Sequence, residues 1–247
     1  MGLDMSEIDP KNNDDVLLRA ARNQLMLFEK VVEPEFREIL SNVREFTMCS
    51  MPALYDLYKS LKYVNQAGVP GDILEVGCWK GGALGLVLAA DETKSRRVFG
   101  FDTFEGHLQP PEFETDIRGS NMRARWQELA DQGLPWNKAD YLECTKLLSN
   151  LSHGRSDLFR LIVGDIKVTS KEFTNLTLSI LRIDCDWYEE SLVSLETFWP
   201  MVSSGGILIL DDYGHHPGQK RAADEFFSSS KLKFTHVDYS CVAIQKP

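Results

Sequence analysis

Short runs of apolar residues alternate with helix-like stretches from Gly71 to the end of the chain. The helix-like stretches repeat apolar residues every three or four positions, whereas the runs between them are continuous. This alternation is typical of βαβ units and a mostly parallel sheet. The expected strands are 72–77, 97–102, 159–163, 178–184 and 206–211, and the expected connecting helices are 82–90, 189–199 and 217–228. Two late runs, 233–237 and 241–245, predict a closing antiparallel hairpin.

Three helical patterns precede the first strand. One ends at about residue 32, one covers 34–43, and one begins near Ser50, a suitable N-cap with Pro52 in its first turn. The pattern predicts a Rossmann-like α/β fold with a helical extension in front of it. The expected divisions are a disordered segment 1–13, a helical extension 14–68 and a sheet domain 69–247.

A long insertion is expected after the second strand. Residues 104–119 are rich in proline, glutamate and glycine, and helical patterns follow to about 150, so we assign the insertion to 104–150. Long loops in compact domains often serve as lids or binding loops. A surface insertion without function is an equally good interpretation.

Composition narrows the range of functions. The chain has 247 residues, enough for one α/β domain with an extension, and a formal net charge of -10, which disfavours nucleic acid and anionic membranes as partners. No apolar stretch is long enough to span a bilayer, and the N-terminal residues do not resemble a signal peptide. The 5 cysteines are irregularly spaced, which argues against a disulfide framework or zinc site and favours a reducing cytoplasm.

A glycine-rich turn follows the first expected strand. Gly77 ends the strand, and Gly81 and Gly82 open the next helix. Glycine permits close backbone approach to a ligand, and a helix N-terminus favours an anionic group. The spacing is not the G-x-G-x-x-G of dinucleotide enzymes. A tight turn without a ligand is the alternative interpretation.

Two acids make this turn more informative. Glu75 lies inside the strand, where an unused carboxylate is costly, and Asp102 ends the second strand, where it can accept ribose hydroxyls. S-adenosylmethionine requires only the looser turn and an acid, whereas NAD requires the tighter pyrophosphate fingerprint. S-adenosylmethionine is therefore the favoured ligand, and a nicotinamide-dependent oxidoreductase stays as an alternative.

Aspartates gather after two later strands. Asp184 and Asp186 follow the fourth expected strand, and Asp211 and Asp212 follow the fifth. The carboxyl ends of parallel strands line a ligand crevice, so these side chains are expected to converge. Close carboxylates repel unless a cation or a proton is present, and an all-oxygen set suits Mg²⁺. Separate helix N-caps are the alternative, above all for Asp186 and Asp212.

These segments together resemble the macrocin-type (TylF-like) O-methyltransferases, which methylate sugar hydroxyls on macrolide and aminocoumarin antibiotics. The matching segments are Glu-x-Gly-x-Trp-x-Gly-Gly at 75–82, Asp-Thr-Phe-Glu-Gly at 102–106, Leu-Arg-Ile-Asp-x-Asp-x-Tyr-Glu at 181–189, Pro-x-x-x-x-Gly-Gly at 200–206 and Asp-Asp-Tyr at 211–213. Residues 46–50 resemble the family's Thr-Met-x-Ser lead-in.

The resemblance implies a class I methyltransferase fold, a homodimer, S-adenosylmethionine as donor and Mg²⁺ as metal. It implies that Asp184 is the base and that Asp184, Asp211 and Asp212 hold the metal. The cofactor-binding residues that it implies are Thr47, Met48, Ser50, Glu75, Gly77, Trp79, Gly81, Gly82, Asp102, Thr103, Asp165, Ile166 and Asp184.

Departures from the family pattern leave the acceptor open. Cys185 stands where the family usually has glycine, the family's Asp-Thr after the third strand reads Val168-Thr169, and the insertion matches no substrate loop. A catechol-type phenol methyltransferase and a catalytically silent binding protein stay as alternatives. The remaining expectations are Trp187 and Tyr188 lining the acceptor site, Trp79 in the core or on the cofactor, and His107, His215 and His216 as secondary candidate bases or surface side chains.

Overall fold

The computed structural model describes residues 30–247. The segment 1–13 and nearly all of the helix expected to end at about 32 lie outside the described residues.

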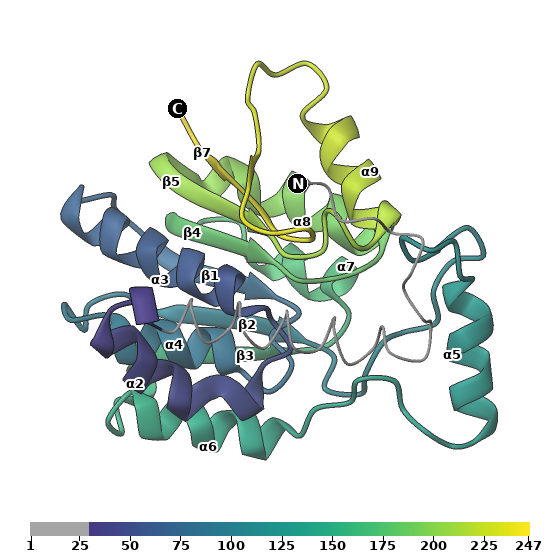
Figure 1. The fold of residues 1–247 in the computed structure, drawn as a ribbon, viewed down its shortest axis with the longest axis horizontal. Coiled ribbons are helices and arrows are strands. Elements are labelled where there is room, and N and C mark those ends of the chain that lie inside the picture. The colour runs from purple at the N-terminus through teal and green to yellow at the C-terminus, as the bar shows by residue number, and fades with distance from the viewer. Residues whose placement is uncertain (1–29) are drawn as a thin grey trace, which may run out of the picture.

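A seven-stranded sheet forms the centre of the described chain, in the order β3-β2-β1-β4-β5-β7-β6 (Figure 1). The first five strands in this order, β3 to β5, run parallel to one another. Strand β7 is antiparallel to both β5 and β6, as the sequence predicts. The strands are β1 Asp72–Val76, β2 Val98–Asp102, β3 Phe159–Val163, β4 Leu178–Ile183, β5 Val202–Leu210, β6 Thr235–His236 and β7 Val242–Gln245. Strand β5 begins ahead of its expected start because Val202 pairs with Leu178 before a bulge in the ladder.

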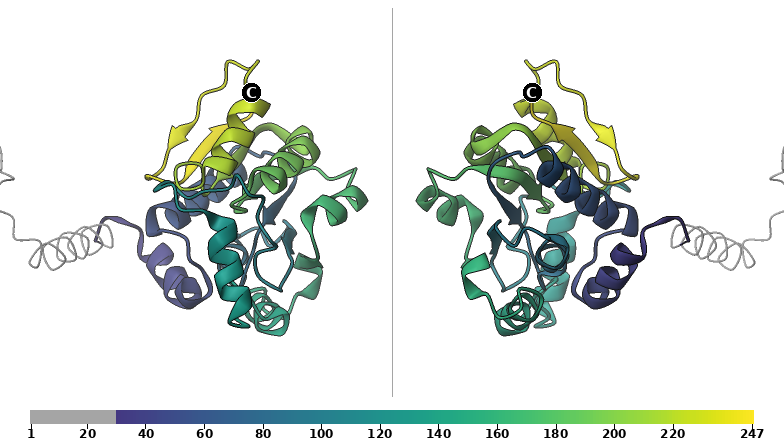
Figure 2. Two further views of the ribbon diagram at one scale, coloured as in Figure 1. Left: turned by 90° about the vertical axis from the view of Figure 1, so that its right-hand side faces the viewer. Right: turned by 90° about the vertical axis from the view of Figure 1, so that its left-hand side faces the viewer.

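Helices cover both faces of this sheet (Figure 2). On one face lie α3 (Met51–Gln66), α4 (Gly82–Ala90) and α6 (Tyr141–Leu151), with α2 (Pro34–Val43) packed on α4. On the other face lie α7 (Ile166–Thr169), α8 (Tyr188–Phe198) and α9 (Pro217–Phe226). Short 3₁₀ turns lie at Arg44–Phe46, Ser156–Leu158, Ser170–Glu172 and Trp199–Met201.

Strand alternation divides the core into two layers. Ile73 of β1 packs with the α3 and α4 side, whereas Leu74 and Val76 pack with the α8 and α9 side. Helix α4 is apolar on every side because it is enclosed by α2, α3, α6 and the sheet. Ser50 caps α3 by accepting a hydrogen bond from the Ala53 amide at 3.1 Å, as expected for an N-cap serine.

The insertion is shorter than the sequence suggested. Helix α6 packs against α4 and serves as the crossover between β2 and β3, so it belongs to the sheet domain. Only the segment that ends near residue 140 protrudes, and it carries α5 (Met122–Asp131), whose single buried residue is Met122. Figure 1 shows α5 standing away from the sheet at the edge of the molecule. We therefore place the end of the insertion near residue 140 rather than at the expected boundary of 150.

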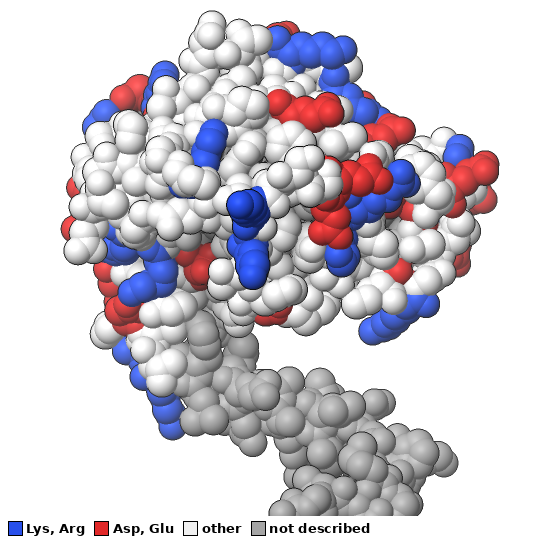
Figure 3. Space-filling view, turned by 90° about the horizontal axis from the view of Figure 1, so that it is seen from above, with Lys and Arg blue, Asp and Glu red and all other residues white. Residues whose placement is uncertain are grey.

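Charge is mixed on the surface seen from above. Lysine and arginine alternate with aspartate and glutamate among the described residues of that face (Figure 3). Within the described part of the chain, no helix has the length and apolar character needed to cross a membrane.

Candidate active site

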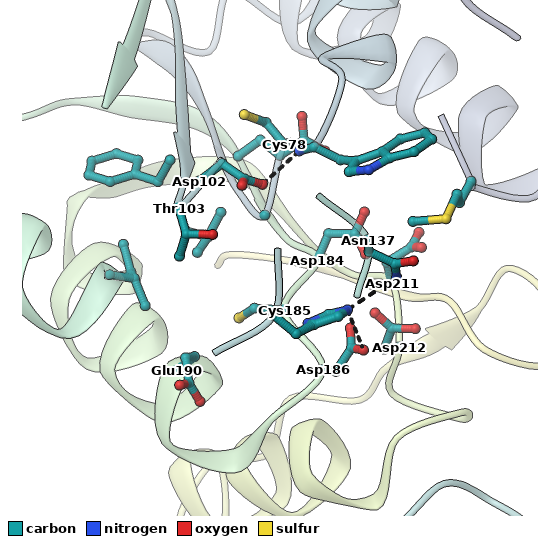
Figure 4. Close-up of a pocket in the computed structure, with 18 of the residues that line it drawn as sticks. Cys78, Asp102, Thr103, Asn137, Asp184, Cys185, Asp186, Glu190, Asp211 and Asp212 are labelled. Atoms are coloured by element: carbon teal, nitrogen blue, oxygen red, sulfur yellow. Dashed lines mark hydrogen bonds and ion pairs between the residues drawn. The ribbon is translucent and has the colours of Figure 1, made fainter. Parts of the chain in front are cut away.

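A pocket of about 290 Å³ lies at the carboxyl ends of the parallel strands (Figure 4). Asp102 and Thr103 lie on one side of it, and Asp184, Asp186, Asp211 and Asp212 lie on the other. The remaining lining comes from residues 46–49, the glycine turn, residues 106–108, 137 and 164–166, and the start of α8. The pocket thus collects most of the residues that the sequence analysis singled out.

The glycine turn is fixed by backbone contacts. Gly77 has φ 83°, and a Cβ there would overlap the carbonyl oxygen of Asp184, so the strand ends of β1 and β4 approach too closely for any side chain. Asp102 accepts hydrogen bonds from the Trp79 and Phe104 amides, each at 2.8 Å. Burial raises the pKa of Asp102. This carboxylate therefore holds the turn in place as well as lining the pocket.

Three expected cofactor residues do not line the pocket. A Cβ on Gly81 would meet the Cys144 sulfur at 2.7 Å, and one on Gly82 would meet the Phe46 carbonyl oxygen at 2.6 Å, so these glycines make room for protein packing. The Ser50 hydroxyl caps α3 and hydrogen-bonds Asp238. Neighbouring segments of the chain occupy the space beside these residues, so their contact with the cofactor stays a prediction.

All of the other expected cofactor residues line the pocket: Thr47, Met48, Glu75, Gly77, Trp79, Asp102, Thr103, Asp165, Ile166 and Asp184. Trp79 also packs against the core, as one of its two interpretations predicts, whereas its contact with the cofactor stays a prediction. Its indole N–H is buried without a hydrogen-bond partner. Asp165 additionally caps α7 by accepting from the Lys167 amide.

A buried arginine organises the floor of the pocket. Arg182 has 2% of its side chain exposed and lies on the same face of the sheet as Glu75, Asp184 and Asp211, because these residues occupy matching positions on β1, β4 and β5. Its guanidinium forms ion pairs with Glu75, with Asp184 at 2.7 Å and with Asp211 at 2.6 Å. Three carboxylates therefore share one permanent cation.

Burial dominates the electrostatics of this group. It raises the pKa of Glu75 to about 8 and that of Asp211 to about 7, although Arg182 opposes both shifts. The Cys49 sulfur completes the group at 2.9 Å from an Arg182 nitrogen, and burial raises the pKa of its thiol. Cys49 is thus a protonated thiol rather than a nucleophile.

The structure divides the expected metal-binding trio. Asp184 and Asp211 gather with Cys49 around Arg182, whereas Asp212 gathers with Asp186 and His216. Burial is the main cause that raises the pKa of Asp212 well above its usual range, and repulsion from Asp186 and Asp184 raises it further. The three acids of the trio thus belong to two different groups in this arrangement, because Arg182 draws two of them to one side, and their joint role as metal ligands stays a prediction.

The donor chemistry nevertheless fits a divalent cation. The Asp184 and Asp186 carboxylates raise the pKa of Asp212 by repulsion, and a proton or a cation relieves such repulsion. Oxygen donors of this kind suit a hard divalent ion.

The expected histidines and aromatic residues differ in their positions. Asp186 lies 3.2 Å from the Nε2 atom of His216 and 3.5 Å from that of His107, and both histidines line the pocket. His216 is 7% exposed, so it is not a surface side chain. Trp187 lines the pocket as expected, but the Tyr188 hydroxyl donates to Glu225 outside it.

The insertion is fastened to this site by one buried acid. Glu114 is 1% exposed and accepts a hydrogen bond at 2.8 Å from the Tyr188 amide in the first turn of α8. A Cβ on Gly218 would overlap its carboxylate, so the first turn of α9 is close as well. Both helix N-termini thus face the same negative charge.

Sequence reasoning assigned no role to Cys49, Arg182 or Glu114. An arginine between apolar residues of a buried strand is a signal for an ion pair, so Arg182 was detectable. The sequence does not show that Cys49 and Glu114 reach the pocket, because their partners lie more than 70 positions away along the chain.

Known proteins match this chain closely. The model of the macrocin-O-methyltransferase (TylF) family matches residues 7–246. A tetracenomycin rhamnosyl 4'-O-methyltransferase of Streptomyces olivaceus is 31% identical over 68% of this chain and 62% of its own length. Demethyldecarbamoylnovobiocin O-methyltransferase of Streptomyces niveus is 30% identical over 85% of this chain and 76% of its own length.

Solved structures of two methyltransferases have a fold similar to that of this chain. The O-methyltransferase NovP superposes with a TM-score of 0.67 at 27% identity, covering 81% of this chain and 82% of its own. The calicheamicin methyltransferase CalS11 shares the fold, with a TM-score of 0.64 at 18% identity over 99% of this chain and 97% of its own.

Proposed function

Because the chain belongs to the macrocin O-methyltransferase family, we propose that it transfers a methyl group from S-adenosylmethionine to a hydroxyl group on the sugar of a glycosylated small molecule. The observation that carries this proposal is one pocket in which Asp102, at the end of β2, faces an aspartate group at the ends of β4 and β5. The nicotinamide alternative lacks its glycine fingerprint.

The acceptor class rests on the relatives. Three of them are named for a rhamnosyl tetracenomycin, demethyldecarbamoylnovobiocin and mycinamicin III as their substrates. Mycinamicin III 3''-O-methyltransferase of Micromonospora griseorubida is 29% identical over 68% of this chain and 65% of its own length. A sugar hydroxyl is a poor nucleophile, so the pocket must help to remove its proton.

Asp184 is the residue that we assign to this proton. Its carboxylate lines the pocket with 24% of the side chain exposed, and Arg182 fixes its orientation from below. In the reaction, one Asp184 oxygen accepts the proton of the acceptor hydroxyl. The hydroxyl oxygen then bonds to the methyl carbon as the bond from that carbon to sulfur breaks, and S-adenosylhomocysteine leaves. Pocket walls that hold the hydroxyl oxygen, the methyl carbon and the sulfur in line can lower the activation free energy by roughly 7 kcal/mol or more.

A divalent cation is part of the proposal. Asp212, which lies between Asp184 and Asp186, would hold it at the acidic end of the pocket. Such an ion, when bound, lowers the pKa of the acceptor hydroxyl. We further expect a cytoplasmic homodimer, because the 5 cysteines are free thiols and the family resemblance implies two subunits.

Calorimetric titration tests the donor site first. S-adenosylhomocysteine is expected to bind with micromolar affinity, and NAD is not. Radiolabelled methyl transfer to the three antibiotic precursors then tests the acceptor class. Asp184→Asn should keep S-adenosylhomocysteine binding and lose at least about a hundredfold in kcat, since general base catalysis contributes about that much. NAD binding without S-adenosylhomocysteine binding would overturn the proposal.

A further inference from the structure

The insertion between β2 and α6 reaches the pocket only at its two ends. Gly106, His107 and Leu108 follow β2, Asn137 precedes α6, and all four line the pocket. Helix α5, which lies between these two ends, does not line it. The proposed function gives none of these four residues a role, although they form one wall of the pocket.

Backbone contacts hold the two ends of the insertion together. The His107 amide donates to the Trp136 carbonyl oxygen at 2.9 Å, and the Trp126 indole N–H donates to the His107 carbonyl oxygen at 2.8 Å. A Cβ on Gly106 would lie 2.4 Å from the same Trp136 oxygen, so the two segments are in direct contact. The side chains of His107 and Asn137 therefore face the pocket from fixed backbone positions.

Aromatic packing fixes the His107 ring. Its centroid lies 5.0 Å from that of Trp136 and 5.3 Å from that of Trp187, the N-cap residue of α8. Tilted and edge-to-face contacts of this kind hold a ring in a defined orientation. The His107 side chain is 20% exposed, and its Nε2 atom lies 3.5 Å from Asp186 and 3.2 Å from the Asn137 Nδ2 atom. The imidazole therefore fixes one end of the Asn137 amide.

Asn137 keeps most of its hydrogen-bonding capacity. A side-chain amide offers an acceptor oxygen and two N–H donors, and among the described residues this one contacts only His107. The backbone of Asn137 has φ 57°, and sparsely populated conformations of this kind are frequent at ligand sites. Figure 4 shows Asn137 on the same side of the pocket as Asp184 and Asp211 and away from Thr103. Its free donor and acceptor thus lie on the side where the acceptor hydroxyl would meet its base.

We propose that Asn137 and His107 are specificity-determining residues for the acceptor. The Asn137 amide hydrogen-bonds a second oxygen of the sugar whose hydroxyl is placed on Asp184, and His107 holds that amide in position. The substrate class is then a sugar that carries a further hydroxyl or ether oxygen within reach of the methylated position, rather than one that is deoxygenated there. The inference rests on the proposed function and gives the insertion a role in it.

Acceptor kinetics test the role of Asn137. The probes are the rhamnosyl tetracenomycin, demethyldecarbamoylnovobiocin and mycinamicin III, each at saturating S-adenosylmethionine. Asn137→Gly removes the amide without straining the left-handed backbone. It should raise the acceptor KM about three- to tenfold, as expected for one lost hydrogen bond, and change kcat less than about twofold. The affinity for S-adenosylhomocysteine should not change. The kcat/KM ratio between the probes should change, because their sugar oxygens differ.

His107→Phe tests the positioning role. It keeps an aromatic ring between the two indoles but removes the nitrogen that contacts Asn137. It should raise the same KM, and the double variant with Asn137→Gly should raise it little beyond the larger single effect, because both changes remove one contact. Gln127→Gly is the matched control, since Gln127 is an exposed amide of the same insertion that hydrogen-bonds Asp131 and does not line the pocket. Circular dichroism checks that each variant is folded.

The outcomes separate this inference from the proposed function. Methyl transfer with an acceptor KM that Asn137→Gly leaves unchanged would refute the inference and keep the proposed function. A KM rise that Gln127→Gly reproduces, or a loss of S-adenosylhomocysteine affinity in Asn137→Gly, would refute it as well. If the unmodified protein binds S-adenosylhomocysteine but methylates none of the three probes, the proposed acceptor class is wrong and the inference falls with it.

Discussion

Replacing Arg182 with methionine is expected to be severely destabilising. The substitution keeps an unbranched apolar stem but removes the only cation shared by Glu75, Asp184 and Asp211 among the described residues. Arg182 and Glu75 are 2% and 3% exposed, so water cannot replace the lost partner without opening the core. The carboxylates must then take up protons or remain buried and unpaired.

The size of the effect follows from burial. Removal of one partner of a buried ion pair costs about 3–5 kcal/mol. Arg155→Met is the matched control, because Arg155 also pairs with an aspartate, Asp157 at 2.7 Å, but both side chains are more than half exposed. That pair should contribute little to stability, because water screens an exposed ion pair.

Urea unfolding followed by circular dichroism measures both changes. Arg182→Lys should lie between the unmodified protein and Arg182→Met, because lysine keeps the charge but not the planar fork that reaches three acids. Adding Glu75→Gln to Arg182→Met should recover part of the loss, since it removes one uncompensated charge. If Arg182→Met cost no more than Arg155→Met, the buried network would not stabilise the fold and the reasoning would fail.

Four further substitutions test the turn and the insertion. Gly77→Ala should cost about 2 kcal/mol in thermal unfolding and weaken S-adenosylhomocysteine binding, because its Cβ would overlap the Asp184 carbonyl at positive φ; an unchanged melting temperature would contradict this. Glu114→Ala should cost about 1–2 kcal/mol, and Gly218→Ala should add little to it in the double variant, because both disrupt the same contact with Tyr188 and α9; additive losses would argue against one shared contact. Burial raises the pKa of Glu114 above its usual value of 4.5. The contribution of this side chain to the free energy of unfolding is therefore fully present below pH 4.5 and is lost as pH rises through the raised pKa. Glu114→Gln should therefore become increasingly more stable than the unmodified protein as pH rises above 4.5 toward the raised pKa of Glu114, and parallel stability curves in urea would refute it.

The regular elements were predictable because each carries its own period. Helix 34–43 was predicted with the bounds that α2 has, and β3 likewise, because local hydrophobic patterns determine both. Helix α6 was assigned to the insertion because nothing local distinguishes a crossover helix from an inserted one. Only its contact with α4 reveals its role.

The part of the site that lies at the carboxyl ends of the strands was predictable from the sequence. Parallel strands bring their carboxyl ends together, so Asp102, Asp184 and Asp211 converge from the topology alone. How the acids are shared was not predictable, because it depends on which way each side chain points. Asp211 and Asp212 are adjacent in sequence but join different groups.

One physical cause connects the fold of this site to its chemistry. Alternation along a strand sends Asp211 to the face where Arg182 lies and turns Asp212 away from it, toward Asp186. The buried guanidinium thus permits several acids at one sheet edge. It neutralises Asp184 and Asp211, whereas Asp186 and Asp212 have no such cation beside them. The arginine that stabilises the floor of the pocket thereby also determines where added positive charge is most favourable.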